Sequence, residues 1–159
     1  MATTLQVRAL RLAYRVAYVV LGIWWFLRRP HTRGVKLVIR DGDDVLFVRH
    51  SYGRRREWEL PGGGVKGREG PSDAARRESA EELGLQIDRW TPVGEIVSEG
   101  YATARLSCLT AACDHRPLKV DPVEIEEVRW APLAAPPEPL GPHATRVLQL
   151  PGVIGERTS

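Results

Sequence analysis

The sequence has few cysteines that could stabilise a fold through disulfides or bound zinc. Only two cysteines, Cys108 and Cys113, occur among its 159 residues. A structural zinc site would need more ligands nearby and a disulfide framework would need more cysteine pairs, so the sequence excludes both as the basis of the fold. The two thiols are expected to be buried or half-buried, in a protein of the reducing cytoplasm.

A strong excess of one charge is absent as well. The formal net charge is only +3, with 27% charged residues. This balance is too weak to predict specific nucleic-acid binding. With 43% hydrophobic residues, a chain of this length can form one globular domain with its own core.

No apolar run is long enough to predict a membrane span. Residues 16–27 carry no charge, but a spanning helix needs about 20 apolar residues and Arg15 interrupts the run. Arg8, Arg11 and Arg15 would share one face of a helix. Residues 1–30 are therefore expected to form a basic and apolar helix. It would either lie on a membrane surface or dock on protein, on the domain itself or in a homodimer.

Residues 31–150 have the pattern of one α+β domain. Strand-like segments at residues 35–40 and 45–50 flank a short turn and predict a β-hairpin. A glycine-rich turn follows, and then a helix with Pro71 at its first position and Gly84 at its end. The other elements expected are strands at residues 91–98, 101–113 and 126–131, a closing helix at 143–150, and a polar tail at 151–159.

Three glutamates gather on one face of the helix after the glycine turn. Glu78, Glu81 and Glu82 are separated by spacings that make them neighbours on the helix surface. Like charges placed this way destabilise a helix by a few tenths of a kcal/mol, so the cluster needs solvent or a cation. The glycines at residues 62–64 would let the backbone approach a metal or a phosphate. Oxygen ligands alone favour Mg²⁺, and then Mn²⁺, over zinc.

The order of residues around these glutamates resembles the Nudix box. Gly63 is followed by Glu69 and then by the segment Arg-Glu-Ser-Ala-Glu-Glu-Leu-Gly-Leu at residues 77–85, over 23 positions in all. Ser79 is the one departure, at a position where the family usually has an aliphatic residue that packs beneath the helix. The resemblance covers about residues 34–150. It implies an α/β/α sandwich with a mixed β-sheet, to which the N-terminal helix would be an addition.

The resemblance also implies an activity and roles for individual residues. The activity is that of a Mg²⁺-dependent nucleotide pyrophosphohydrolase, which cleaves a nucleoside diphosphate linked to another group. Arg77 would orient the carboxylates, paired with Glu69. The implied metal ligands are all oxygens: Glu78, Glu81, Glu82 and the carbonyl of Gly62 or Gly63.

Hydrolysis of a diphosphate needs an activated water, neutralised phosphate charge and aligned attacking and leaving oxygens, which bound divalent ions supply. We expect Glu81 or Glu82 to accept the proton of the water. Family members also use a glutamate outside the box as the base, so Glu124, Glu126 and Glu127 are alternatives.

The residues expected to contact the substrate lie outside the box. Arg54, Arg55 and Arg56 precede the glycine turn and could meet phosphates, although a solvated turn explains them equally well. Tyr101 stands where a tyrosine resembles the pattern of dinucleoside polyphosphate hydrolases and could stack on a base, but it also begins a β-rich stretch. The expected substrates are dinucleoside polyphosphates, oxidised nucleoside triphosphates or sugar nucleotides.

A second function class remains open at this point. The chain could be a nucleotide-sensing module, tethered by its N-terminal helix, that kept the fold and lost turnover. A module of that kind would be expected to lack at least one of Glu78, Glu81 and Glu82, and all three are present. The carboxylates therefore favour catalysis.

Overall fold

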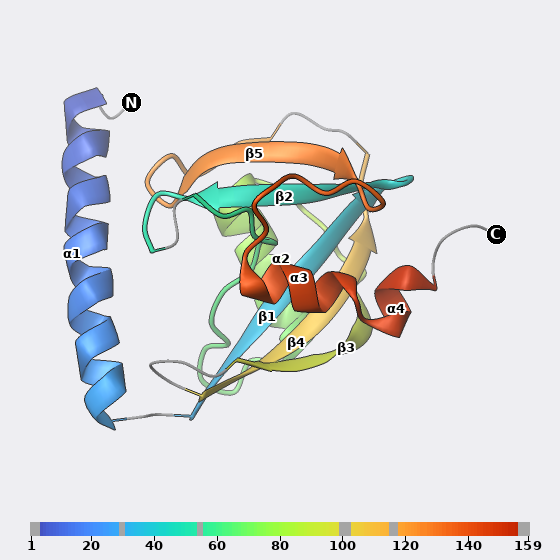
Figure 1. The fold of residues 1–159 in the computed structure, drawn as a ribbon, viewed down its shortest axis with the longest axis horizontal. Coiled ribbons are helices and arrows are strands. Elements are labelled where there is room, and N and C mark those ends of the chain that lie inside the picture. The colour runs from blue at the N-terminus through green and yellow to red at the C-terminus, as the bar shows by residue number, and fades with distance from the viewer. Residues whose placement is uncertain (1–3, 29–30, 54–55, 99–102, 115–117, 156–159) are drawn as a thin grey trace.

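The computed structural model describes residues 4–28, 31–53, 56–98, 103–114 and 118–155. Its elements follow one another along the chain as shown in Figure 1. They are α1 (Thr4–Arg28), β1 (His31–Asp41), β2 (Asp44–His50), α2 (Pro71–Leu83), β3 (Thr91–Ser98), β4 (Thr103–Ala112), β5 (Ile125–Pro132), α3 (Pro142–Leu148) and α4 (Pro151–Ile154).

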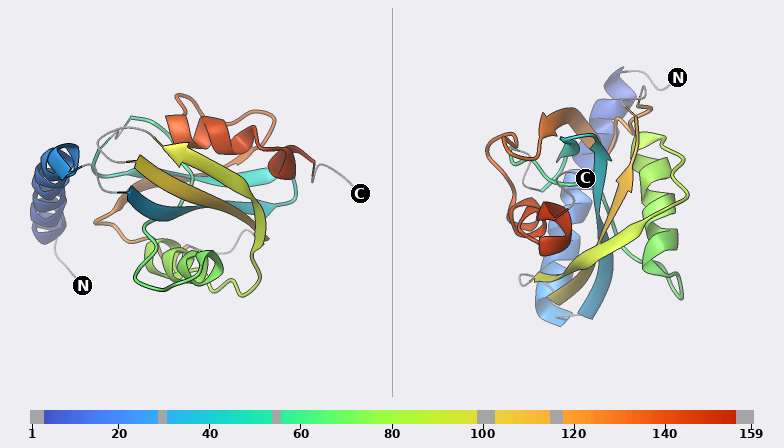
Figure 2. Two further views of the ribbon diagram at one scale, coloured as in Figure 1. Left: turned by 90° about the horizontal axis from the view of Figure 1, so that it is seen from below. Right: turned by 90° about the vertical axis from the view of Figure 1, so that its right-hand side faces the viewer.

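The strands form a five-stranded mixed sheet in the order β3-β4-β1-β2-β5. The β1–β2 pair is antiparallel, which confirms the predicted hairpin, and β1 pairs with β4 in parallel. Figure 2 shows α2 on one face of the sheet and α3 with α4 on the other. The predicted α/β/α sandwich with a mixed sheet is therefore confirmed.

The central strand β1 is buried on both faces because its side chains alternate between two cores. Leu37 and Ile39 pack in the core beneath α2, with Ala74 and Leu83 of that helix. Val38 points the other way, into the core beneath α3. The segment at residues 61–63, which comes after β2, is hydrogen-bonded to this buried central strand.

The ends of α2 lie where the sequence predicts them. Gly70 is the N-cap, Pro71 occupies the first turn, and Gly84 ends the helix in the left-handed conformation with φ of 68°. Ser79 is fully buried on this helix, and its hydroxyl donates a hydrogen bond to the carbonyl oxygen of Leu85 at 3.2 Å. The chain therefore accepts a polar residue at this packing position because the hydroxyl has a backbone partner.

The C-terminal segment differs from the predicted polar tail. The closing helix ends at Leu148, and α4 follows it with Pro151 in its first turn. Val153 is 1% exposed, and its carbonyl accepts a hydrogen bond from Arg40 at 3.1 Å. The prediction of a polar tail was wrong for residues 151–154, because α4 packs on β3, which is far away in the sequence.

The N-terminal helix α1 lies beside the sandwich, next to the end of β2 and the start of β5 (Figure 1). Arg11 donates a hydrogen bond to the carbonyl oxygen of Pro122 at 2.8 Å, and Arg15 donates one to that of Ser51 at 3.1 Å. None of the described helices is both long and apolar enough to cross a membrane.

Candidate active site

The glycine turn is bound tightly against β1. The amides of Val35 and Leu37 donate to the carbonyl oxygens of Gly63 and Pro61 at 2.9 and 3.0 Å. Gly62 has φ of +139°, and a Cβ on it would lie 2.2 Å from the carbonyl oxygen of Val35. Glycine is required here for both reasons. The Gly63 carbonyl, a predicted metal ligand, already accepts one hydrogen bond and has one lone pair left.

Helix α2 brings two of the three box glutamates against this turn. Glu78 and Glu82 are 8% and 3% exposed, whereas Glu81 is exposed at the rim. The amide of Gly62 donates to Glu82 Oε2 at 3.1 Å. The Glu78 carboxylate lies so close to Gly63 that a Cβ on that glycine would be 2.4 Å from Oε1. The fold therefore buries two carboxylates directly against the backbone of two glycines.

Two negative charges at this pair are unfavourable unless a proton or a cation offsets them. Burial raises the pKa of Glu82 to about 8, and the negative charge of Glu78 adds to this, while the Gly62 amide and the Lys36 charge oppose it. Within the described ranges no three acidic, histidine or cysteine side chains converge into a ready-made cage. Mg²⁺ and Mn²⁺ fit such a partial set, because Mg²⁺ keeps several waters and takes further oxygens from substrate phosphates.

Arg77 connects the carboxylates to the loop before the helix. Its guanidinium holds Glu69 through two hydrogen bonds of 3.0 Å, which confirms the predicted contact. It also donates to Glu78 at 2.7 Å, to Glu81 at 3.2 Å and to the carbonyl oxygen of Gly64 at 2.8 Å. The Arg77 guanidinium holds the pKa of Glu69 at about 2, well below its usual range. One side chain thus fixes two box glutamates relative to the glycine turn.

Arg77→Lys is expected to lower metal-dependent activity by about 10- to 100-fold, the usual effect of losing a group that orients metal ligands. Lysine keeps the charge but cannot form the planar two-bond contact with Glu69 and reach Glu78 as well. Turnover measured against metal concentration checks this. Equal activity of Arg77→Lys and the wild type at every metal concentration would contradict the positioning role.

The three glutamates proposed as alternative bases have different surroundings. Burial raises the pKa of Glu124, the hydrogen bond from Tyr14 opposes this, and the charges of Asp121, Glu78 and Glu81 add smaller upward effects. Glu127 is paired with Arg49 on the neighbouring strand, and Glu126 is exposed. The structure therefore brings Glu124 toward the box carboxylates.

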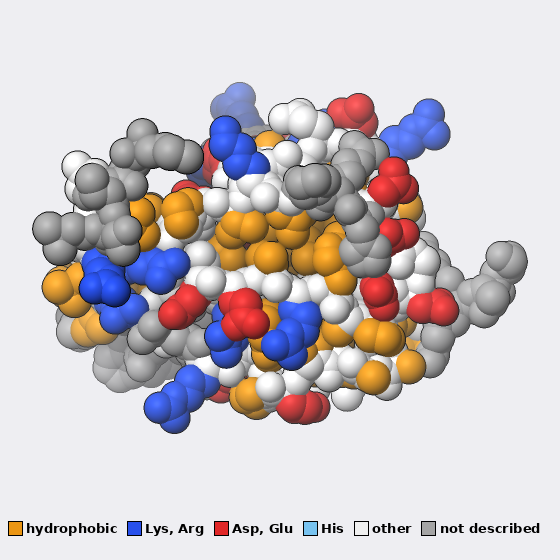
Figure 3. Space-filling model, turned by 90° about the horizontal axis from the view of Figure 1, so that it is seen from above, with side chains coloured by type: hydrophobic (Ala, Val, Ile, Leu, Met, Phe, Trp, Pro, Cys, Tyr) orange, Lys and Arg blue, Asp and Glu red, His pale blue; other side chains and the backbone are white. Residues whose placement is uncertain are grey.

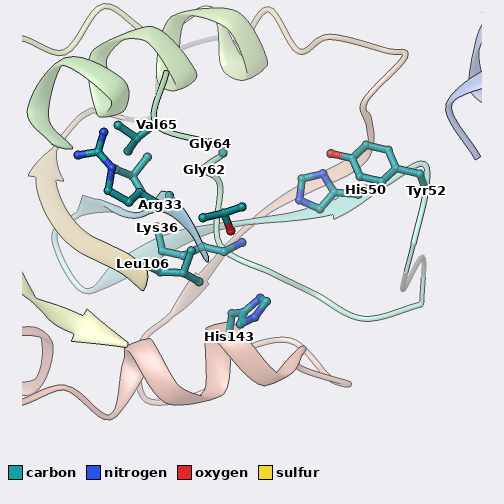
Figure 4. Close-up of a pocket in the computed structure, with 13 residues that line it drawn as sticks. Arg33, Lys36, His50, Tyr52, Gly62, Gly64, Val65, Leu106 and His143 are labelled. Atoms are coloured by element: carbon teal, nitrogen blue, oxygen red, sulfur yellow. The ribbon is translucent and has the colours of Figure 1, made fainter. Parts of the chain in front are cut away.

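A cavity of about 590 Å³ opens beside the glycine turn (Figure 4). Arg33 and Lys36 of β1 reach it, and His143 enters from α3. His50 at the end of β2 and Tyr52 just after it form a further wall, with ring centroids 5.2 Å apart. The cavity thus offers cations and aromatic rings next to the buried carboxylates.

Lys36 is one of the residues of this cavity that the sequence analysis missed. Its Nζ donates to the carbonyl oxygen of Leu60 at 2.9 Å and lies 3.5 Å from Glu59. Glu59 in turn accepts a hydrogen bond from the amide of Ala144 at the start of α3. The available signal was a lysine inside the otherwise apolar run at residues 35–39, because such a charge is rarely buried without a partner or a function.

The residues predicted to bind substrate lie elsewhere or are not described. Arg56 is exposed and does not line the cavity. Arg54, Arg55 and Tyr101 lie outside the described residues, so their predicted roles are not tested.

His50 should make the stability of the protein depend on pH. Burial, and then the Lys36 charge, lower the pKa of His50 from 6.5 to about 3. Below pH 6.5 the unfolded chain binds a proton that the folded protein excludes, so stability is present above that pH and lost as the pH falls toward 3. At pH 5 the loss is about 2 kcal/mol.

Urea unfolding at pH 7.5 and pH 5 checks this prediction, with His50→Gln as the comparison. The wild type should lose more stability than His50→Gln between the two pH values. Equal losses would show that His50 is protonated in the folded protein at pH 5.

Comparison with known proteins agrees with this site. The family model described as NUDIX domain matches residues 30–150. The chain is 33% identical over 87 residues to the RNA pyrophosphohydrolase of Rickettsia bellii and 37% identical over 84 residues to that of Rickettsia prowazekii. Each alignment covers 52% of this chain and 44% or 45% of the relative, so the chain spans less than half the length of these proteins.

A solved structure with a similar fold covers more of the chain. The MutT NUDIX hydrolase from Burkholderia pseudomallei superposes with a TM-score of 0.71, at 23% identity, over 76% of this chain and 98% of its own. That likeness supports the fold. Because the family model matches most of the chain, from the first strand to the end of α3, the protein belongs to the NUDIX domain family.

Proposed function

We propose that this protein is a metal-dependent hydrolase that cleaves the diphosphate linkage of a nucleoside derivative. The observation that carries the proposal is the burial of Glu78 and Glu82 against the glycine turn, because Gly62 and Gly63 of that turn line a cavity that Lys36 also lines. Buried carboxylates suit a divalent cation, and a nearby lysine suits a phosphate. Family membership supports the same reaction class.

In this proposal the residues have separate tasks. A divalent ion bound by the box carboxylates would lower the pKa of water and offset phosphate charge. Glu82 holds the ion or accepts the proton of the water, with Glu81 as the neighbouring candidate and Glu124 as the candidate outside the box. Lys36 and Arg33 draw the phosphates into the cavity. Water adds to phosphorus, and the bond from that phosphorus to the bridging oxygen breaks.

The substrate we propose is a nucleoside polyphosphate, with dinucleoside polyphosphates and oxidised nucleoside triphosphates as first choices. The rings of His50 and Tyr52 offer a stacking surface for a base at the wall of the cavity. The RNA pyrophosphohydrolases that resemble this chain add RNA to the compounds to be tested.

The test is release of phosphate, pyrophosphate or nucleoside monophosphate from these compounds and from sugar nucleotides, with Mg²⁺, Mn²⁺ or a chelator present. We expect turnover that requires the metal. Binding of metal and nucleotide without turnover of any compound would contradict the proposal and favour a sensing module.

A further inference from the structure

Helix α1 has two faces of opposite character. Toward the domain it presents polar groups: Arg11 and Arg15 bind backbone carbonyls, and the Tyr14 hydroxyl donates to Glu124 at 3.1 Å. The ring of Tyr18 contacts that of Tyr52 at a tilt of 41°, with centroids 5.6 Å apart. The side turned away is apolar, and four of its residues are 57–60% exposed: Leu12, Val16, Val19 and Val20.

This orientation is the reverse of the usual one for a helix packed on a soluble domain, whose apolar stripe faces the core. Their spacings of four, three and one place these four residues on one side of the helix over about two turns, so they form a continuous surface. A helix of 25 residues is about 37 Å long, and it lies along the domain. The apolar face is thus available without any undocking of α1.

The charge of α1 indicates what covers this face. The helix contains four arginines, at positions 8, 11, 15 and 28, and no acidic residue. Two copies packed through this face would place two helices of like positive charge side by side, with no acidic residue on either helix to pair with it, whereas an anionic surface would attract the helix. Figure 3 shows apolar side chains beside a group of Lys and Arg at its left margin, where Figure 1 places α1.

We propose that α1 is an in-plane membrane anchor whose exposed apolar face enters the surface of a bilayer rich in anionic lipids. A basic helix with an apolar stripe that is not apolar enough along its length to cross a membrane has the features of such an anchor. Tyr52 lines the cavity and its ring also contacts that of Tyr18 on α1. The cavity therefore lies close to the helix that would bind the membrane. The proposal does not depend on the proposed hydrolase activity.

The experiment is sedimentation of the full chain with vesicles of phosphatidylglycerol and phosphatidylcholine, compared with phosphatidylcholine alone. We expect the wild type to bind the anionic vesicles, and binding to weaken with salt. The double variant Val16→Glu and Val20→Glu should bind about tenfold less or worse, because it places charges on the inserted face. Circular dichroism checks that its fold is unchanged.

The matched control is the double variant Val97→Glu and Ile154→Glu. These residues are exposed apolar side chains on β3 and α4, away from α1, and should not affect binding. The anchor is ruled out if the wild type stays in the supernatant, or if both double variants bind as the wild type does. A dimer detected by light scattering that Val16→Glu and Val20→Glu dissociate, without vesicle binding, would instead assign the face to a second copy.

Discussion

Turnover by the Glu82→Gln variant is expected to fall by about 10²- to 10⁴-fold while the fold is retained. Glutamine has the same shape, and its amide oxygen can still accept the hydrogen bond that the Gly62 amide donates to Glu82 Oε2 at 3.1 Å. It cannot carry the negative charge that binds a divalent ion or accept a proton from water. The variant therefore removes chemistry from a buried position without leaving a cavity.

The measurement is kcat on the best substrate over a range of Mg²⁺ and Mn²⁺ concentrations. Glu95→Gln is the control, because Glu95 is exposed on β3 and pairs with Arg105, away from the cavity. Glu82→Gln with wild-type kcat at saturating metal would remove Glu82 from the proposed mechanism. Glu124→Gln would then be the next variant, since that glutamate also faces the box.

The parts of the fold that the sequence predicted are those set by local signals. The hairpin follows from a short turn between two apolar strands, and α2 follows from Pro71 and Gly84. Strand β1 begins earlier than predicted, at His31, because it pairs along its length with β4. That pairing joins residues about 70 positions apart, and no local pattern specifies it.

The same distinction holds for the site. Glu69 and Arg77 are close in the sequence, and their predicted pairing is confirmed. Lys36 and Tyr52 reach the cavity only after the sheet has formed, so the sequence pattern did not identify them. The basic and apolar character of α1 was predicted from the sequence, but the face that contacts the domain was not. The arginines face the domain because backbone carbonyls of Ser51 and Pro122 accept their hydrogen bonds.

Gly63→Ala should lower metal-dependent turnover by about 10²-fold, the scale of a misplacement of about 1 Å in an active site. A Cβ at this position would lie 2.4 and 2.7 Å from the two carboxylate oxygens of Glu78. The backbone of Gly63 is not in the left-handed region, so alanine can adopt it. The part that must move is the end of a flexible side chain, and the domain should remain folded.

Gly70→Ala is the matched control, because a Cβ there would meet only Asp73 at 3.6 Å, an ordinary contact. Metal affinity and kcat should both be measured, together with the midpoint of thermal unfolding. We expect Gly63→Ala to need a higher metal concentration and to turn over more slowly at an unfolding midpoint near that of the control. If Gly63→Ala binds metal and turns over like Gly70→Ala, the Glu78 carboxylate is not held in its working position by the glycine turn. The proposed ligand set would then have to be built on Glu81 and Glu82 instead.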